Sequence, residues 1–171
     1  MKDKIPFFEI VNKFFIGAVF SILFVLLTAE RIALLYVYNE YASILKDWSV
    51  LAVSVLVITM YEIGFIINRA SSAFIAPVLE KTKIWPKGKY DVDISEIKEK
   101  NKSFEAMITE NIVTRSHILM FLLLSVVALV CSKWWFAVAF ILCIISLVFA
   151  GRKHSKRINQ IRNAEAARKE K

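Results

Sequence analysis

The side chains most able to take part in chemistry are a few charged and polar groups that lie within apolar stretches. Glu62 falls inside YEIGFIINR (61–69), which ends in Asn68 and Arg69. In an α-helix, Glu62 and Arg69 would project from nearly the same face, about 10 Å apart along the axis. A carboxylate and a guanidinium so placed can form an ion pair, or they can line a path for ions or water.

A second polar stretch, TRSH (114–117), begins another apolar run. We expect it to lie at a similar depth, so that both stretches form one cluster at the inner mouth of a helical bundle. The predicted cluster consists of Glu62, Asn68, Arg69, Arg115 and His117. It could be a structural ion pair, a protonated carboxyl near the interface, or a gate for ions or water. A buried pair alone does not decide between these alternatives.

The sequence lacks the motifs of the common hydrolases and nucleotide-binding enzymes. It has two histidines, His117 and His154, and it contains no zinc-protease motif, nucleophile elbow or phosphate-binding glycine-rich loop. We therefore expect no enzyme, no cofactor, no metal site and no small-molecule substrate. An intramembrane enzyme that uses an acid such as Glu62 is the remaining alternative in that class.

Four apolar runs must position these residues, and 57% of the chain is hydrophobic. A helix that crosses a hydrocarbon core needs about 17–25 mostly apolar residues, and its backbone must satisfy its own hydrogen bonds. A soluble bundle is disfavoured because too little polar surface remains to cover four such helices. We predict an all-α polytopic membrane protein with a single membrane domain. Its transmembrane helices are expected at about 14–30, 48–68, 115–131 and 134–150.

The basic residues are distributed unevenly along the chain. Segments 1–13, 68–115 and 151–171 hold 3, 9 and 8 of them, whereas the other two connections hold 2 and 1. Lys and Arg near membrane spans prefer the cytoplasmic side, and an even number of spans places both termini on one side. We therefore predict a multi-pass protein of the bacterial inner membrane, with both termini and segment 69–114 in the cytoplasm.

Segment 69–114 is the largest soluble portion. Pro77, Pro86 and Gly88 predict that the stretch 76–93 starts as a helix end or a loop. Ser95 is the predicted N-cap of a helix that continues into the third span and forms a cytosolic stalk. The tail, 151–171, has eight basic and two acidic residues, a net charge of +6, and is expected to continue the fourth helix. Segment 31–47 contains no Gly or Pro and is expected to extend the first helix, and an interfacial helix outside the membrane is the alternative.

The basic tail predicts contact with anionic lipid or with a cytosolic protein or ribonucleoprotein partner. Each basic residue near an anionic leaflet contributes about 1 kcal/mol, and the same side chains neutralise nucleic-acid phosphates. The simplest role of such a tail is to keep the C-terminus on the cytoplasmic side of the membrane. The candidate contact residues are Arg152, Lys153, Lys156, Arg157 and Arg162.

Smaller features concern helix packing. Gly17 and Ser21 form a pair of small residues that allows close contact between membrane helices. Cys131 and Cys143 are expected to be unpaired thiols within the membrane. The short connection SKWW (132–135) predicts that the last two spans form an antiparallel hairpin.

The stretches YEIGFIINRASSAFIAPVLEKTKIWP (61–86) and NKSFEAMITENIVTRS (101–116) resemble small multi-pass transmembrane effectors of retron-like anti-phage systems. The resemblance covers about residues 58–115 and lies in layout rather than in a motif. Members of that group are held silent by a partner complex and damage the inner membrane when released. The resemblance implies a toxic, non-enzymatic effector and carries over no functional residues. The four-span layout departs from the simpler two-span effectors.

These observations predict two alternative functions. In the first, the chain is an inner-membrane effector that permeabilises or depolarises the membrane, with Glu62, Arg69 and Arg115 holding a closed state. Four helices are too few to enclose a wide pore, so this function requires a homo-oligomer. In the second, the chain is a non-conducting scaffold or accessory subunit that uses the cytosolic stalk as a docking surface.

Overall fold

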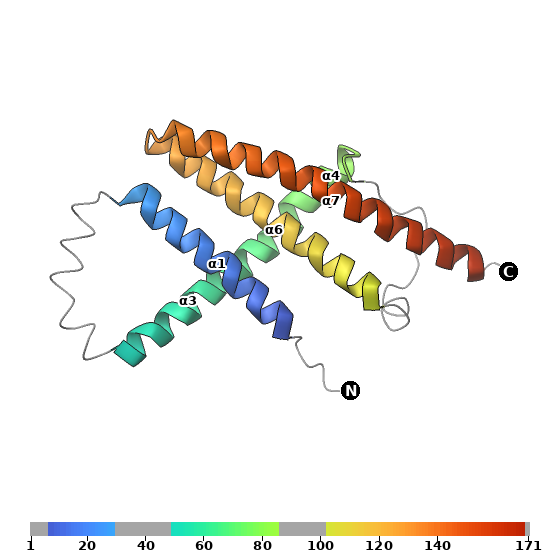
Figure 1. Ribbon diagram of the computed structural model, residues 1–171, viewed down its shortest axis with the longest axis horizontal. Coiled ribbons are helices and arrows are strands. Elements are labelled where there is room, and N and C mark those ends of the chain that lie inside the picture. The colour runs from blue at the N-terminus through green and yellow to red at the C-terminus, as the bar shows by residue number, and fades with distance from the viewer. Residues whose placement is uncertain (1–6, 30–48, 86–101, 170–171) are drawn as a thin grey trace. The chain divides into compact units, whose positions relative to one another are not determined.

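The computed structural model describes residues 7–29, 49–85 and 102–169. All regular structure of these residues is helical, which confirms the predicted all-α class. The elements in chain order are α1 (Phe7–Thr28), α3 (Ser49–Ala70), the π-helical turn η1 (Ser71–Ile75), α4 (Ala76–Lys81), α6 (Lys102–Val130) and α7 (Trp134–Lys169) (Figure 1).

Four helical stretches are long and apolar enough to cross a membrane, and they support a multi-pass membrane protein. They are Ile10–Thr28, Ser49–Lys81, Phe104–Val130 and Trp134–Arg168. Many of their large apolar side chains are exposed, among them Val50 at 81% and Leu26 at 58%. Soluble proteins rarely expose such continuous apolar surface, whereas lipid is a suitable solvent for it.

The described chain forms two compact units. The first contains the residues up to Ile67 together with Met120–Ile141, and the second contains Asn68–Leu119 together with the chain from Leu142 onward. Helices α6 and α7 therefore contribute residues to both units. The single membrane domain expected from the sequence stays a prediction.

In the first unit, α1 crosses α3 at two glycines (Figure 1). A Cβ atom added to Gly17 would overlap the carbonyl oxygen of Met60, and one added to Gly64 would overlap that of Lys13. The two helix backbones therefore touch directly, as small residues permit in membrane helices. The predicted close contact at Gly17 is thus present, and Gly64 is its partner.

Lys13 lies one turn before Gly17 and strengthens the same crossing. Its side chain is buried at 8% exposure, and its ammonium lies 5.4 Å from the centroid of the Phe65 ring. A cation within about 6 Å of a ring centroid is attracted by the negative face of the ring. The contact helps to offset the cost of burying a charge beside an apolar helix pair.

A Schellman turn ends α6 and begins the hairpin to α7, which confirms the predicted hairpin. Ser132 adopts a φ of 57°, the Lys133 N–H donates to the Ala128 carbonyl at 2.8 Å, and the Ser132 N–H donates to the Leu129 carbonyl at 3.0 Å. These bonds satisfy carbonyls that a helix end leaves unpaired. The Lys133 ammonium also donates to the Leu26 carbonyl at 3.0 Å. That carbonyl is in the last turn of α1, where a cation is favourable.

In the second unit, the π-helical turn η1 carries the helix past a proline. The Ala76 N–H donates to the Ser71 carbonyl, one residue further back than in an α-helix. Pro77 has no N–H, and in a regular helix its ring would clash with the carbonyl four residues earlier. The wider turn removes the clash, so the helix continues to Lys81. The helix end predicted for this stretch lies at Lys81, so Pro77 itself does not end the helix.

After α4 the chain turns back and places Trp85 in the core of the second unit. Lys83 has a φ of 58°, and the Trp85 N–H donates to the Leu79 carbonyl at 3.0 Å. The Trp85 side chain is 4% exposed, and its Nε1 lies 3.4 Å from the Val148 carbonyl, long for a hydrogen bond. A Cβ atom on Gly151 would overlap the indole. Glycine is thus required at this point of α7 because the indole fills the space.

Helices α6 and α7 extend beyond the apolar runs, with 29 and 36 residues. The predicted continuous helices, one leading into the third span and one leaving the fourth, are therefore confirmed over the described residues. Cys131 and Cys143 are free thiols, as predicted. The helix expected over 31–47 and the N-cap expected at Ser95 lie outside the described residues.

We predict that Gly64→Ala destabilises the purified protein, because the added methyl group forces α1 and α3 apart. Overpacking a close contact typically costs about 1–3 kcal/mol. Unfolding in detergent micelles, followed by loss of helical circular dichroism, measures the change. Ala139→Val enlarges an exposed position of α7 and is the matched control. Equal stability of the two variants would show that the glycine contact is not tight.

Candidate functional site

A polar layer joins α3 and η1 to α6 in the second unit. It consists of Asn68, Ser71 and Ser116, and both serines are fully buried. The Ser116 hydroxyl donates to Asn68 Oδ1 at 3.1 Å and lies 3.2 Å from the Ser71 oxygen. The Ser71 hydroxyl donates to the Asn68 carbonyl at 2.8 Å. The polar layer therefore connects segments that are far apart in the sequence.

The hydroxyl proton of Ser116 has more than one acceptor within reach. Besides Asn68 and Ser71, the Ile112 carbonyl lies 3.0 Å from the same oxygen. One proton cannot serve all of them at once, so the interhelical bond competes with a bond inside α6. Such bonds between membrane helices are worth about 0.6 kcal/mol on average. The polar layer thus fixes the register of the helices more than it holds them together.

The polar layer includes only part of the cluster predicted from the sequence. Asn68 reaches α6 through Ser116, a residue that the sequence analysis did not single out. The Nδ1 atom of His117 lies 2.9 Å from the Val113 carbonyl, so it bonds within its own helix. Arg69 is exposed. In the sequence Ser116 lies between Arg115 and His117, and nothing there indicates that its hydroxyl contacts another helix.

Glu62 belongs to the first unit and is exposed on α3. Among the hydrogen bonds and ion pairs of the described residues, none involves its carboxylate. Its neighbours Ile58 and Ile66, one turn away on either side, are more than half exposed. The carboxylate therefore lies on an apolar, outward-facing surface of this helix.

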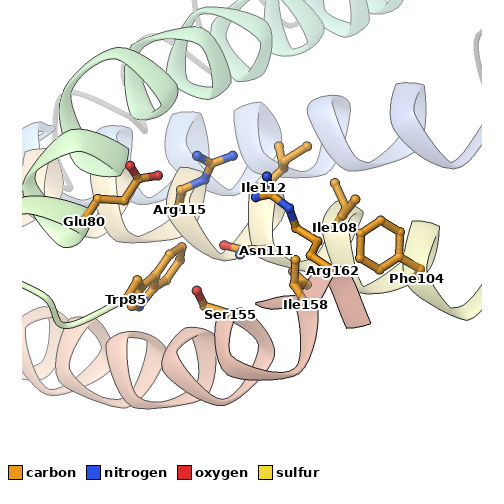
Figure 2. A pocket seen from close by; sticks show the side chains of 10 residues that line it. All are labelled: Glu80, Trp85, Phe104, Ile108, Asn111, Ile112, Arg115, Ser155, Ile158 and Arg162. Carbon is orange, nitrogen blue, oxygen red and sulfur yellow. The ribbon is translucent and has the colours of Figure 1, made fainter. Parts of the chain in front are cut away.

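A cavity of about 320 Å³ lies in the second unit, and we call it the arginine pocket (Figure 2). Residues from the end of α4, from α6 and from the tail part of α7 surround it. In Figure 2 the Arg162 side chain extends from α7 towards α6. The lining residues are Glu80, Trp85, Phe104, Ile108, Asn111, Ile112, Arg115, Ser155, Ile158 and Arg162.

The arginine pocket brings together two residues that the sequence analysis assigned to different features. Arg115 was predicted in the membrane cluster, and Arg162 was predicted as a lipid or partner contact of the tail. Glu80 is the single acidic residue of the lining and interacts electrostatically with Arg115. Two guanidinium groups and one carboxylate give the lining a formal charge of 2 − 1 = +1.

A further contact joins α6 to α7 near the pocket. His154 Nδ1 lies 3.2 Å from Glu110 Oε2, although the two groups are not aligned as a hydrogen bond. The pair attracts when the imidazole is protonated. Within 7–29, 49–85 and 102–169, no group of three or more His, Cys, Asp or Glu residues could hold a metal ion.

The remaining predicted contact residues of the tail lie on the outside of α7. Arg152, Lys153, Lys156 and Arg157 are exposed, so they are available to lipid or to a partner. Of the five candidate contact residues, only Arg162 lines the arginine pocket.

Comparison with family models, with curated proteins and with solved structures finds no match for this chain.

We predict that Ser116→Ala destabilises the protein modestly, because Asn68 Oδ1 loses its buried donor. The expected loss is about 0.5–2 kcal/mol of unfolding free energy. Denaturation in detergent micelles measures it. Ser146→Ala is the matched control, since Ser146 is exposed and its hydroxyl donates to the Leu142 carbonyl of its own helix. A Ser116→Ala loss no larger than that of the control would contradict a role for the polar layer.

Proposed function

We propose that this chain is an effector of the bacterial inner membrane, and that several copies together permeabilise or depolarise that membrane in anti-phage defence. Control by a partner complex is part of the proposal. The observation that supports permeabilisation best is the exposed carboxylate of Glu62 on α3.

If α3 faces only lipid, the position of the Glu62 carboxylate makes insertion of this helix less favourable. It is about 20 Å along the helix from Ser49, at the rise of an α-helix. A hydrocarbon core is about 30 Å thick, so the carboxylate falls within it when the helix starts near one surface. Insertion scales assign an acidic residue at the centre of a span a cost of a few kcal/mol, on the order of 3 kcal/mol.

Two hydroxyl groups of the same helix avoid this cost by bonding to that helix. The hydroxyls of Ser54 and Thr59 on α3 donate to the Val50 and Val55 carbonyls, both at 2.8 Å. An ionised carboxylate has no proton to donate and cannot use the same solution. Glu62 therefore favours an arrangement in which it faces water or another protein chain.

An assembly of several copies provides that arrangement. If α3 of each copy faces a common axis, the Glu62 carboxylates form a ring around water. Rings of acidic side chains are the usual device of cation-conducting pores. One chain with four candidate spans cannot enclose such a path by itself.

The defence role and the partner follow from the resemblance of residues 58–115 to effectors of retron-like systems. The helical extensions of α6 and α7 beyond the apolar runs give a partner complex a surface to hold. Release of that surface would be the trigger for membrane damage.

Glu62→Gln tests the role of the carboxylate. Induced in bacteria at matched expression, the natural chain should depolarise the membrane and admit a dye, and the variant should do so about tenfold more slowly. This factor corresponds to a loss of about 1.4 kcal/mol in the stabilisation of the permeating cation. Flow cytometry with a potential-sensitive dye measures the rate.

Glu105→Gln is the matched control, since it removes the same charge from an exposed position of α6. It should depolarise as fast as the natural chain. Depolarisation by Glu62→Gln at the full rate would remove the carboxylate from the mechanism.

A non-conducting scaffold or accessory subunit is the second candidate. The four exposed basic residues of α7 between Arg152 and Arg157 favour it, because they form a surface on which an acidic partner could dock. Harmless expression of the natural chain, together with stable co-purification of one partner, would support this candidate over the effector.

Both candidates place the termini and the α6–α7 extensions in the cytoplasm. Green fluorescent protein fused after the tail should therefore fluoresce, and alkaline phosphatase fused at the same point should be inactive, because it folds only outside the cytoplasm. An active phosphatase fusion would reverse the proposed topology.

A further inference from the structure

We infer that the arginine pocket is a binding site for an amphipathic phosphate ester, whose phosphate lies between Arg115 and Arg162 and whose apolar part lies along the isoleucines. Binding at this site does not depend on membrane permeabilisation, so the two proposals can fail separately.

The charges of the lining favour an anion. Arg115 and Arg162 approach the cavity from different helices, and Glu80 is the single acidic residue of the lining. Guanidinium groups bind phosphate through two parallel hydrogen bonds, which gives them both affinity and geometric preference. A phosphate is therefore the anionic group that best suits a pair of arginines that face one cavity.

Buried polar atoms of the lining also favour a phosphate ligand. Among the described residues, Arg115 Nε and Asn111 Oδ1 are buried and have no hydrogen-bond partner. Buried donors and acceptors are nearly always paired, since an unpaired one loses its hydration without compensation. A phosphate oxygen can accept from Arg115, and a hydroxyl of the same ligand can donate to Asn111.

The apolar walls decide against a bare inorganic ion. Ile108 and Ile112 from α6 and Ile158 from α7 line the cavity, together with the buried ring of Trp85. The volume of about 320 Å³ is at the lower end of the roughly 300–1,000 Å³ of small-molecule sites. A ligand that fills it needs an apolar body attached to its phosphate.

The position along α7 gives two sources for such a ligand. At the rise of an α-helix, Ser155 and Arg162 lie about 32 and about 42 Å from Trp134, the first residue of the helix. A hydrocarbon core is about 30 Å thick, so the pocket lies at the depth of lipid headgroups when Trp134 is at the opposite surface and α7 runs along the membrane normal. Basic pockets at this depth bind anionic headgroups, and soluble phosphate esters reach the same level from the cytoplasm.

The test uses the full chain with Trp85 as its only tryptophan, obtained by replacing Trp48, Trp134 and Trp135 with Phe. Trp85 lines the pocket, so its fluorescence reports occupancy. In one arm, the protein in phosphatidylcholine nanodiscs is titrated with n-butyl phosphate, a water-soluble ester that carries a short apolar chain. In the other, the nanodiscs contain increasing amounts of phosphatidylglycerol. A response only in the second arm identifies lipid as the source, and a response in the first identifies a soluble ester.

Arg162→Gln should weaken the response about tenfold to a hundredfold, the loss expected for a hydrogen bond to a charged group. Arg168→Gln is the matched control, because it removes the same charge from an exposed position of the same helix, outside the pocket and the candidate contact residues, and should leave the response unchanged. Ile158→Phe keeps both arginines but fills the cavity, and it should also weaken binding. Its melting temperature in phosphatidylcholine nanodiscs shows whether the variant is folded.

Two results would overturn the inference. One is the absence of a Trp85 response in both arms. The other is an equal loss in Arg168→Gln and Arg162→Gln, which would mean that general attraction between the basic tail and anions explains the signal.

Discussion

In a hydrocarbon core, every backbone N–H and C=O must find its partner inside the protein, and the structure of this chain depends on that constraint. It makes each span a helix, and it determines how each interruption is repaired. At Pro77 a wider turn keeps the helix intact, with the Ala76 N–H bonded to the Ser71 carbonyl. Between α6 and α7 a Schellman turn satisfies the last carbonyls within two residues. Several side chains follow the same rule, since the hydroxyls of Ser54, Thr59 and Ser146 bond to carbonyls of their own helices.

Once the backbones are satisfied, small residues determine which helices touch. Gly17 and Gly64 bring α1 and α3 into backbone contact, and Gly151 leaves space for the indole of Trp85. Lipid is as apolar as leucine, so close packing and interhelical polar contacts replace the hydrophobic effect as the source of specificity. The lysines illustrate this: Lys13 lies over the ring of Phe65, and the ammonium of Lys133 bonds to the end of α1. In both places a cation joins helices that apolar surface alone would leave free to slide.

The sequence was sufficient to predict the class of fold, because the length and hydropathy of a span are local properties. The four helices, the hairpin, the free thiols and the long helical extensions follow from such properties. The arrangement of the candidate sites does not follow from such local properties. Arg115 and Arg162 line one cavity, yet nothing local to either residue indicates which face of α6 meets which face of α7. Gly64 and Ser116 were missed for the same reason. Pro77 does not end the helix, because a π-helical turn precedes it, and a local rule for helix breaking does not include such a turn.

That turn has a consequence for how the second span is compared with other sequences. A π-helical turn accommodates one residue more than an α-helical turn, which is the length change made by a single-residue insertion. Residues on either side of Ser71–Ile75 are therefore out of phase by about 100° relative to a continuous α-helix. A helical wheel that applies one constant angle per residue to Ser49–Lys81 therefore places residues from two different faces at the same position. Any row of similar side chains on either face is then harder to recognise. A related chain without the proline is expected to align with a one-residue gap here. Its regular α-helix would keep the corresponding residues on the same faces.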